Sequence, residues 1–524
     1  MPIPVEEPTE TPLLVHEFLS ASAARTPDAI ALLEPGGRIT YGELDALANR
    51  FARLLIDRGV APGDRVLLAL EGSITFVGCY FGTMRAGAVA VPLPAGPRSD
   101  RLATAVADAT PAACVVDTAT VGDPHQAEAL GAVPHRFVVR TGNGTPPDGY
   151  EMLADVLPAT AAAPVVRRID VDLAAIIFTS GSTGTPRGVM LTHLNIRINT
   201  ESIIEYLGLT AADRVMCVLP FHYVYGLSLL HTHMRVGGSV VIDNRFTFPN
   251  VVLAAMEETQ ATGFAGVPST FALLLARSRL PQMTFSHLRY VTQAGGAMPP
   301  ARVEEWRSRG PDVPFWVMYG ATEASARLTA LDPADLPRKL GSIGRPIPNV
   351  EIVIVKENGE LAAPGETGEL VARGANLAQG YWGAPEETAK KFDAIGYRTG
   401  DLGYVDDEGF LFLQGRLHDM IKAGAHRVGA REIEDVLEGF PGIAEVAVVA
   451  GPHPILGEVP VAFVALRSGV TATAAELGAF CHARLAPHKV PARFVLCEDL
   501  PKLAMGKVDR QALRHAAATT APRG

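Results

Sequence analysis

Residues 179–188, TSGSTGTPRG, are the stretch of this sequence whose composition most directly suggests chemistry. They contain three glycines and five hydroxyl residues, and they follow the apolar run AAIIF at 174–178. A loop of this kind exposes N–H and O–H donors that can surround phosphate oxygens, and Arg187 adds a fixed positive charge. It is not a Walker A loop, because no Gly-Lys-Ser/Thr follows at the required spacing. Taken alone it could also be a surface turn, but the preceding apolar run and the arginine favour phosphate binding.

Three other charged residues stand in short Gly-containing motifs. Glu323 lies in YGATEAS after the strand-like PFWVM, Asp401 lies in YRTGDLG, and Lys507 lies in PKLAMGKVDR. A glutamate at a strand end can ligate Mg²⁺ or cap a helix. Asp401 on local grounds is a turn aspartate, and a single lysine is usually a solvated charge. None of the three decides a function alone.

The elements that must position these residues alternate along the chain. Strand-like runs such as RVLLAL (65–70), AAIIFTS (174–180) and GSVVID (238–243) are separated by helix-like stretches. This alternation predicts βαβ units with largely parallel sheets and ligands at the carboxyl ends of the strands. Residues 350–415 instead show short alternating strands between Gly and Asp turns, which predicts a small antiparallel sheet or barrel.

A compact unit with its own strands and helices follows Arg416. We therefore predict an amino-terminal domain over 1–415, a hinge at 416–419 and a carboxyl-terminal domain over 420–524. A chain of 524 residues is too long for one ordinary core, which agrees with two or more domains.

Composition excludes several classes of function. The 46 basic and 56 acidic residues give a net charge of −10, which argues against a nucleic-acid partner. Five scattered cysteines without CxxC pairing indicate buried free thiols rather than a disulfide framework or zinc site. Without a signal-like amino terminus or an apolar run of about 18 residues, we expect a cytoplasmic protein with no stable membrane insertion. The sequence does not indicate an oligomeric state.

In order, the motifs TSGSTGTPRG, YGATE, YRTGD, GR…K…REIE and PK…GK resemble those of the adenylate-forming superfamily. This superfamily contains acyl-CoA synthetases, peptide-synthetase adenylation domains and luciferases. The resemblance extends from residue 39 to residue 510. It implies an α/β fold: a large amino-terminal domain of flavodoxin-like βαβ subdomains plus a small antiparallel β-barrel, and a small mobile α+β carboxyl-terminal domain.

The resemblance also implies ATP and Mg²⁺ as cofactors and a role for each motif residue. Catalytic roles fall to Lys507 and Thr322 at the α-phosphate, to Glu323 as the Mg²⁺ ligand, and to Arg416 near the ribose. The implied nucleotide contacts are Thr179, Ser180, Gly181, Ser182, Thr183, Gly184 and Arg187 for the β- and γ-phosphates, Gly295, Gly296, Ala297 and Tyr319 for the adenine, and Asp401 for the ribose.

The run LPFHYVYGL at 219–227 bears on the substrate. Amino-acid-activating relatives carry an Asp here, but this run has no carboxylate, and an unpaired buried ammonium would be costly. The run resembles that of acyl- and aryl-CoA ligases, which implies His222, Tyr223, Gly226 and Val267 as substrate-binding residues. We expect a fatty, short-chain or aryl acid to form acyl-AMP with release of pyrophosphate. The acyl group is then expected to pass to the thiol of CoA or of carrier-protein phosphopantetheine.

Three positions depart from the usual pattern of this superfamily. Arg187 replaces the usual Lys, His418 stands in the hinge where Asp is common, and Ala425 stands where Gly is usual beside the pantetheine channel. Three alternative functions stay open: an amino-acid-activating enzyme that loads a carrier protein, a luciferase-type oxygenase, and a catalytically dead nucleotide-binding protein. The presence of Glu323, Asp401 and Lys507 argues against the last.

Overall fold

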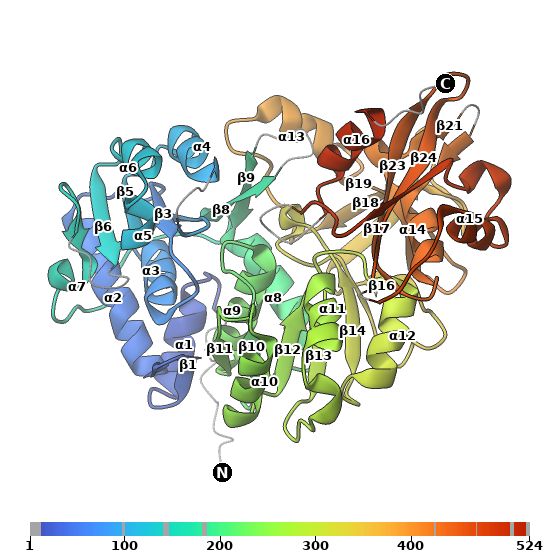
Figure 1. Cartoon of the computed structure of the whole chain (residues 1–524). Coiled ribbons are helices and arrows are strands. Elements are labelled where there is room, and N and C mark those ends of the chain that lie inside the picture. The colour runs from blue at the N-terminus through green and yellow to red at the C-terminus, as the bar shows by residue number, and fades with distance from the viewer. Residues whose placement is uncertain are drawn as a thin grey trace, which may run out of the picture.

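The computed structural model describes residues 12–96, 100–139, 146–180, 186–423, 426–467, 469–502 and 508–519. Three sheets organise the chain, with seven, thirteen and five strands. The seven-stranded sheet and its helices lie on the left of Figure 1, and the parallel strands of the thirteen-stranded sheet lie in the middle. The five-stranded sheet, built from the carboxyl-terminal residues, lies at the upper right.

The seven-stranded sheet is parallel except for its last pair, the β8–β9 hairpin, and has the order β7-β6-β5-β3-β4-β8-β9. Its strands are β3 (Arg65–Ala69), β4 (Val89–Pro92), β5 (Ala113–Asp117), β6 (His135–Val139), β7 (Glu151–Met152), β8 (Leu173–Ser180) and β9 (Pro186–Thr192). Its helices are α2 (Tyr41–Asp57), α3 (Ile74–Arg85), α4 (Asp100–Ala109), α5 (Thr118–Val121), α6 (Pro124–Leu130) and α7 (Leu153–Val156).

The thirteen-stranded sheet joins a parallel half to an antiparallel half, in the order β17-β18-β19-β20-β16-β15-β14-β13-β12-β10-β11-β1-β2. The strands of the parallel half and its edge are β1 (Ile30–Glu34), β2 (Gly37–Thr40), β10 (Arg214–Cys217), β11 (Ser239–Ile242), β12 (Gly263–Gly266), β13 (Tyr290–Gln293) and β14 (Phe315–Tyr319). The antiparallel strands are β15 (Thr329–Leu331), β16 (Ser342–Pro346), β17 (Val350–Val355), β18 (Gly368–Gly374), β19 (Tyr397–Val405) and β20 (Leu411–Arg416).

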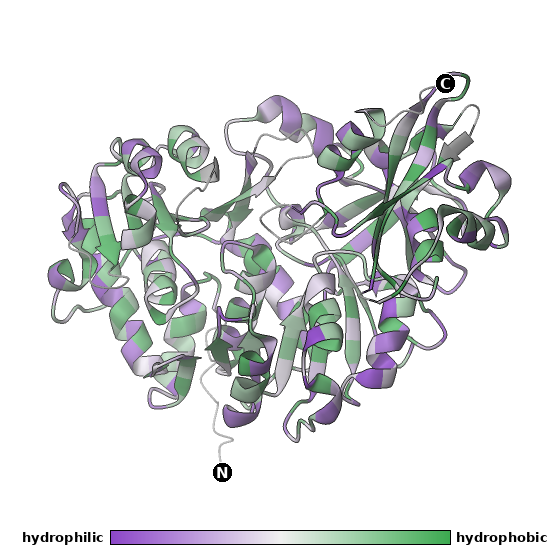
Figure 2. Cartoon of the chain, viewed as in Figure 1, coloured by the Kyte–Doolittle hydropathy of each residue, from purple (hydrophilic) through white to green (hydrophobic). Residues whose placement is uncertain are grey.

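The helices that accompany this sheet are α1 (Glu17–Arg25), α8 (His193–Leu207), α9 (Val224–Val236), α10 (Pro249–Glu258), α11 (Pro268–Arg277), α12 (Pro300–Arg309) and α13 (Pro385–Lys391), with 3-10 turns η1 (Leu280–Gln282) and η2 (Thr322–Ala324). Helix α8 begins directly after β9 because Thr192 and Asn195 form a capping box. The side chain of Thr192 accepts from the backbone N–H of Asn195 at 3.1 Å. Figure 2 shows the sheet strands mainly hydrophobic and the outer helix α13 mainly hydrophilic.

The five-stranded sheet follows the turn η3 (Leu417–Asp419) and is built from β21 (Ile421–Ala423), β22 (His426–Val428), β23 (Ile443–His453), β24 (Gly457–Leu466) and β25 (Arg493–Cys497). Its helices are α14 (Ala430–Glu438), α15 (Ala474–His482) and α16 (Arg510–Thr519), with the turn η4 (Pro487–Lys489). The mixed α/β fold, with a large amino-terminal part and a small carboxyl-terminal part, agrees with the sequence prediction. The domain boundary at 416–419 stays a prediction.

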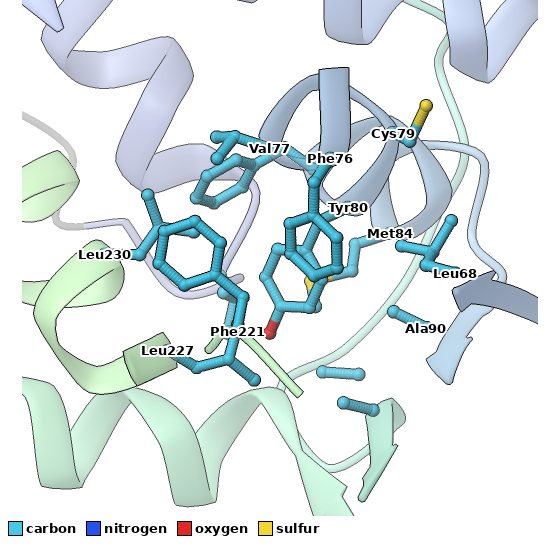
Figure 3. Packing of buried hydrophobic residues seen from close by; sticks show 14 of the residues in the cluster. Leu68, Phe76, Val77, Cys79, Tyr80, Met84, Ala90, Phe221, Leu227 and Leu230 are labelled. Atoms are coloured by element: carbon cyan, nitrogen blue, oxygen red, sulfur yellow. The ribbon is translucent and has the colours of Figure 1, made fainter. Parts of the chain in front are cut away.

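One apolar cluster joins the two large sheets and fixes the start of the predicted acid-binding run. Phe221 stacks on Phe76 of α3 with ring centroids 5.3 Å apart, and Phe76 stacks on Tyr80 at 5.9 Å. Figure 3 shows these rings together with Leu227 of helix α9. Burial of aromatic side chains of this size dominates core energetics. Phe221, which precedes His222 in the predicted acid-binding run, is therefore fixed by this packing.

Cys79, Cys114, Cys217 and Cys481 are buried free thiols, as expected, and Cys497 is a free thiol that is half-buried. Within the described part of the chain, no helix has the length and apolar character needed to cross a membrane.

Candidate nucleotide and acid site

The β8–β9 hairpin carries both ends of the predicted phosphate loop. Thr179 pairs with Arg187 across the hairpin, and Ser180 pairs with Pro186. Residues 181–185 of the predicted loop, with the predicted phosphate contacts Gly181, Ser182, Thr183 and Gly184, lie outside the described residues. The antiparallel pairing thus fixes the positions of Thr179 and Arg187 relative to each other.

Arg187 lies at the base of this hairpin between an acid and an aromatic ring. Its guanidinium is 3.0 Å from the Glu387 carboxylate of α13 and 5.6 Å from the centroid of the Tyr381 ring. An arginine held by a carboxylate and an aromatic face is fixed in orientation. The guanidinium is therefore held on β9, the strand that follows the predicted phosphate loop in sequence.

The same Tyr381 contacts Glu323, 58 residues away in sequence. The Tyr381 hydroxyl donates to Oε1 of Glu323 at 2.7 Å, and the backbone N–H of Ala378 donates to the Glu323 carbonyl at 2.8 Å. The segment containing Tyr381 also pairs with β9, since the N–H of Met190 donates to the carbonyl of Gly380 at 3.0 Å. Residues 378–381 therefore bring the hairpin and the turn η2, with Thr322 and Glu323, into one place.

Tyr319, Asp401 and Arg416 form a second hydrogen-bonded group. The Tyr319 hydroxyl donates to Oδ2 of Asp401 at 2.6 Å, and Nε of Arg416 donates to Oδ1 at 3.1 Å. Asp401 on β19 faces Arg416 on β20 in the antiparallel register, and Tyr319 ends β14. Asp401 is 9% exposed, and each of its oxygens keeps a lone pair for a further donor such as a sugar hydroxyl.

Burial and neighbouring acids keep the two tyrosines of the site protonated. Burial raises the pKa of Tyr319 well above its ordinary value, and the Asp401 carboxylate raises it further. Burial likewise raises the pKa of Tyr381, with the Glu323 carboxylate adding to the effect. Both hydroxyls consequently keep their protons near neutral pH and act as hydrogen-bond donors to these carboxylates.

The predicted adenine turn lies at the carboxyl end of β13. Gly295, Gly296 and Ala297 are exposed, and Gly295 has φ +80°, a conformation that favours glycine. The side chain of Gln293 donates to the Gly296 carbonyl at 2.8 Å. A Cβ on Gly295 would lie 3.1 Å from a methyl group of Val267, so the adenine turn and the predicted acid-binding wall are in contact.

The predicted acid-binding residues lie around the start of α9 and α11. The rings of His222 and Tyr223 have centroids 4.4 Å apart, just before α9. Gly226 is buried, and a Cβ there would lie 2.4 Å from the carbonyl oxygen of Pro220. Glycine at 226 therefore lets the first turn of α9 approach the preceding backbone. The predicted contact of Gly226 with the substrate stays a prediction.

Several predicted residues cannot be placed in this site. Lys507 and Ala425 lie outside the described residues, and His418 is part of the turn η3. Three residues near the site were not selected from the sequence, namely Tyr381, Glu387 and Arg327. The Gly-Tyr-Trp-Gly run at 380–383 was the signal that would have singled out Tyr381.

Comparisons with known proteins identify the family. The AMP-binding enzyme family matches residues 19–382, and the AMP-binding enzyme C-terminal domain matches residues 432–507. The chain therefore belongs to the AMP-binding enzymes. It is 33% identical to a feruloyl-CoA synthase of Amycolatopsis over 94% of this chain and 97% of that protein.

Two solved structures extend this comparison. ATP-bound MatB of Rhodopseudomonas palustris matches with a TM-score of 0.87 and 30% identity, covering 96% of this chain and 98% of that one. O-succinylbenzoate coenzyme A synthetase of Bacillus subtilis, in complex with ATP and magnesium ion, matches with a TM-score of 0.82 and 28% identity. This match covers 95% of this chain and 98% of that one.

Proposed function

We propose that this protein is an AMP-forming acid–CoA ligase. In the first half-reaction a carboxylate oxygen attacks the α-phosphorus of ATP, and the bond to pyrophosphate breaks. In the second half-reaction the CoA sulfur attacks the acyl carbon, the carbon–oxygen bond breaks, and AMP leaves as the thiol proton passes to solvent. Two hydrogen-bonded groups carry the proposal. The Tyr381 hydroxyl holds the Glu323 carboxylate, which suits a metal ion, and Tyr319 and Arg416 hold the Asp401 carboxylate, which suits a sugar.

The residues present suit ATP. Arg187 with the predicted phosphate loop would face the β- and γ-phosphates, and Asp401 would accept hydrogen bonds from the ribose hydroxyls. Tyr319, held by Asp401 at 2.6 Å, would flank the adenine with the exposed turn at 295–297. Fixed donors of this kind need no reorganisation when charge develops on the reacting phosphate, which is the main source of catalysis in phosphoryl chemistry.

Glu323 suits Mg²⁺ as a single protein ligand. Among the residues that the structure describes, no group of three or more His, Cys, Asp or Glu side chains could hold a metal on its own. Mg²⁺ is usually bound by one or two carboxylates together with substrate phosphates and water. The Tyr381 hydroxyl holds the Glu323 carboxylate in orientation, and this carboxylate would hold the ion. When bound, Mg²⁺ would neutralise charge on the phosphate oxygens.

For the acid, we propose a carboxylic acid without an α-ammonium group, because residues 219–227 supply no carboxylate. Relatives named for feruloyl-CoA and O-succinylbenzoate support an acyl or aryl acid and support CoA as the thiol. Loading of a carrier-protein phosphopantetheine is the second acceptor to be tested. We place the reaction in the cytoplasm, where ATP and CoA are both supplied.

A pyrophosphate-release assay across carboxylic acids, with and without CoA, tests the proposal. Aliphatic or aryl acids should outperform all standard L-amino acids, and CoA should convert the bound intermediate to thioester. Holo-carrier protein in place of CoA is the control for the acceptor. Preference for any α-amino acid, or thioester formed on carrier protein and not on CoA, would contradict this assignment.

A further inference from the structure

Arg327 is a buried cation that has no acid partner among the described residues. It is 2% exposed, and its side chain contacts neutral groups: Nε lies 3.4 Å from the sulfur of Met318, a terminal nitrogen donates to the Ala326 carbonyl at 3.1 Å, and the guanidinium stacks 4.1 Å from the Tyr225 ring centroid. Among the residues that the structure describes, no carboxylate lies within ion-pair distance of it. Charged side chains are rarely buried in this way unless paired.

The other buried arginine of the described chain shows the usual arrangement. Arg85 is 4% exposed, and its guanidinium is 2.6 Å from the carboxylate of Asp45 and bonded to the side chains of Asn49 and Ser20. The fold thus supplies an anion where a buried arginine has a structural role. Among the described residues Arg327 has no such anion, so a bound ligand is the candidate to supply it.

The position of Arg327 points to the acid substrate as that ligand. Met318 precedes Tyr319, and Tyr225 follows Tyr223 of the predicted acid-binding run. The Tyr225 hydroxyl also lies 3.0 Å from the carbonyl of Thr292, near the end of β13. The guanidinium therefore lies between α9, β13 and β14. It is near the start of α9 and near the carboxyl ends of the two strands, where the predicted site residues also lie.

The backbone holds Arg327 in this position at a conformational cost. Ser325 has φ +55° and Ala326 has φ +130°, which are unfavourable for residues with a side chain. Two buried amides, Asn199 and Asn376, donate to the Arg327 carbonyl at 3.1 and 2.9 Å. Strained backbone that is fixed from several sides is typical of functional sites.

We propose that Arg327 binds a second acidic group of the substrate, at the end remote from the reacting carboxylate. In the proposed reaction the activated carboxylate lies at the phosphates, whereas the Arg327 guanidinium faces Tyr225 of the predicted acid-binding run. An acid that reaches from the phosphates to Tyr225 would place an acidic group at its remote end beside Arg327. The guanidinium pairs with carboxylates through two parallel hydrogen bonds. This inference rests on the proposed function, because it requires that the chain activate a carboxylic acid.

Paired substrates test the inference on the wild-type enzyme. We would measure kcat/KM for pyrophosphate release with α,ω-dicarboxylic acids of several lengths and with their monomethyl esters, which keep the length and lose the distal charge. The diacids should be preferred by about 10- to 100-fold, since a buried charged partner left unpaired is strongly discriminated against. If kcat/KM for the half-ester equals that for the diacid at every chain length, the inference is overturned.

Variants identify the residue responsible. Arg327→Met should lose about 10- to 100-fold on the diacid while keeping activity on the half-ester, and Arg327→Lys should lose less. Arg289→Met is the matched control, because Arg289 also stacks on a tyrosine, Tyr290 at 4.9 Å, but is paired with Asp213 at 2.9 Å. The control should leave the diacid-to-ester ratio unchanged.

Other outcomes are decisive as well. Equal losses on diacid and half-ester in Arg327→Met would assign Arg327 to the reacting carboxylate or to folding, and would overturn the inference. If Arg327→Met does not fold, the wild-type ratio still decides. If the wild-type enzyme activates half-esters alone, this inference fails and the proposed function stands. No activity on any acid would overturn the proposed function and this inference with it.

Discussion

Tyr381→Phe removes one hydroxyl that orients the predicted Mg²⁺ ligand. The hydroxyl donates to Glu323 at 2.7 Å, and Tyr381 is 5% exposed. A hydrogen bond to a charged group contributes about 1.5–3 kcal/mol. Glu323 is half-buried, so water can replace part of the lost hydrogen bond. We therefore take the lower end of this energy range. About 1.5 kcal/mol corresponds to roughly a tenfold change in a rate or a binding constant.

We therefore expect about tenfold slower acyl-AMP formation at low Mg²⁺, together with a rise in the Mg²⁺ concentration needed for half-maximal rate, as for other groups that orient a metal ligand. The assay is pyrophosphate release at a saturating acid concentration over a Mg²⁺ titration. Tyr41→Phe is the control: its buried hydroxyl lies 2.6 Å from the Gly238 carbonyl, so its loss should lower stability without changing the Mg²⁺ dependence. A Tyr381→Phe enzyme with wild-type rate and Mg²⁺ dependence would refute the reasoning.

Three further predictions concern the turn η2, pH and the carboxyl terminus. Gly320→Ala places a Cβ 1.9 Å from the Ala326 carbonyl oxygen. We therefore expect the free energy of unfolding, measured by urea denaturation, to fall by about 1–3 kcal/mol or more, with loss of activity. A variant with wild-type stability would contradict this. Burial lowers the pKa of His193 to about 4, and its Nδ1 accepts from the N–H of Val15 at 3.1 Å. Since the folded pKa lies below the unfolded value of about 6.5, unfolding takes up a proton. Stability is then fully present above pH 6.5 and falls by at most about 1.4 kcal/mol per pH unit towards pH 4. A thermal midpoint that falls less steeply in His193→Gln would support this, and an identical pH profile in that variant would not. Lys507→Ala should slow acyl-AMP formation by roughly 10²–10³-fold and leave thiolysis of supplied acyl-AMP nearly unchanged; equal damage to both half-reactions would give Lys507 another role.

The strands of the fold could be read from the sequence because their apolar runs are local features. RVLLAL became β3 (Arg65–Ala69), and AAIIFTS became most of β8 (Leu173–Ser180). The antiparallel character of residues 350–415 was also visible, because Gly and Asp turns separate strands that pair with their neighbours in sequence. The continuity of this part with the parallel strands was not predictable, since it depends on β16 (Ser342–Pro346) pairing with β20 (Leu411–Arg416), where Ser342 lies opposite Phe412 from a distant part of the sequence.

The candidate site could be predicted only in part. The motifs supplied Glu323 and Asp401, but their partners Tyr381 and Tyr319 lie 58 and 82 residues away in sequence, and no local pattern reports such contacts. Arg327 was missed for a different reason. An arginine four residues after a glutamate is usually solvent-exposed, and the burial that makes it unusual appears only in the folded chain.

The most direct test of the central claim follows the oxygen atoms of the acid. With a carboxylic acid labelled with ¹⁸O in both carboxylate oxygens, ATP and CoA, mass spectrometry of the nucleotide product should find AMP carrying one ¹⁸O atom and unlabelled pyrophosphate. This label transfer requires attack of the carboxylate on the α-phosphorus, followed by cleavage of the acyl carbon–oxygen bond. Unlabelled AMP, or ADP and labelled phosphate in place of AMP and pyrophosphate, would contradict an acyl-adenylate intermediate and the function proposed here.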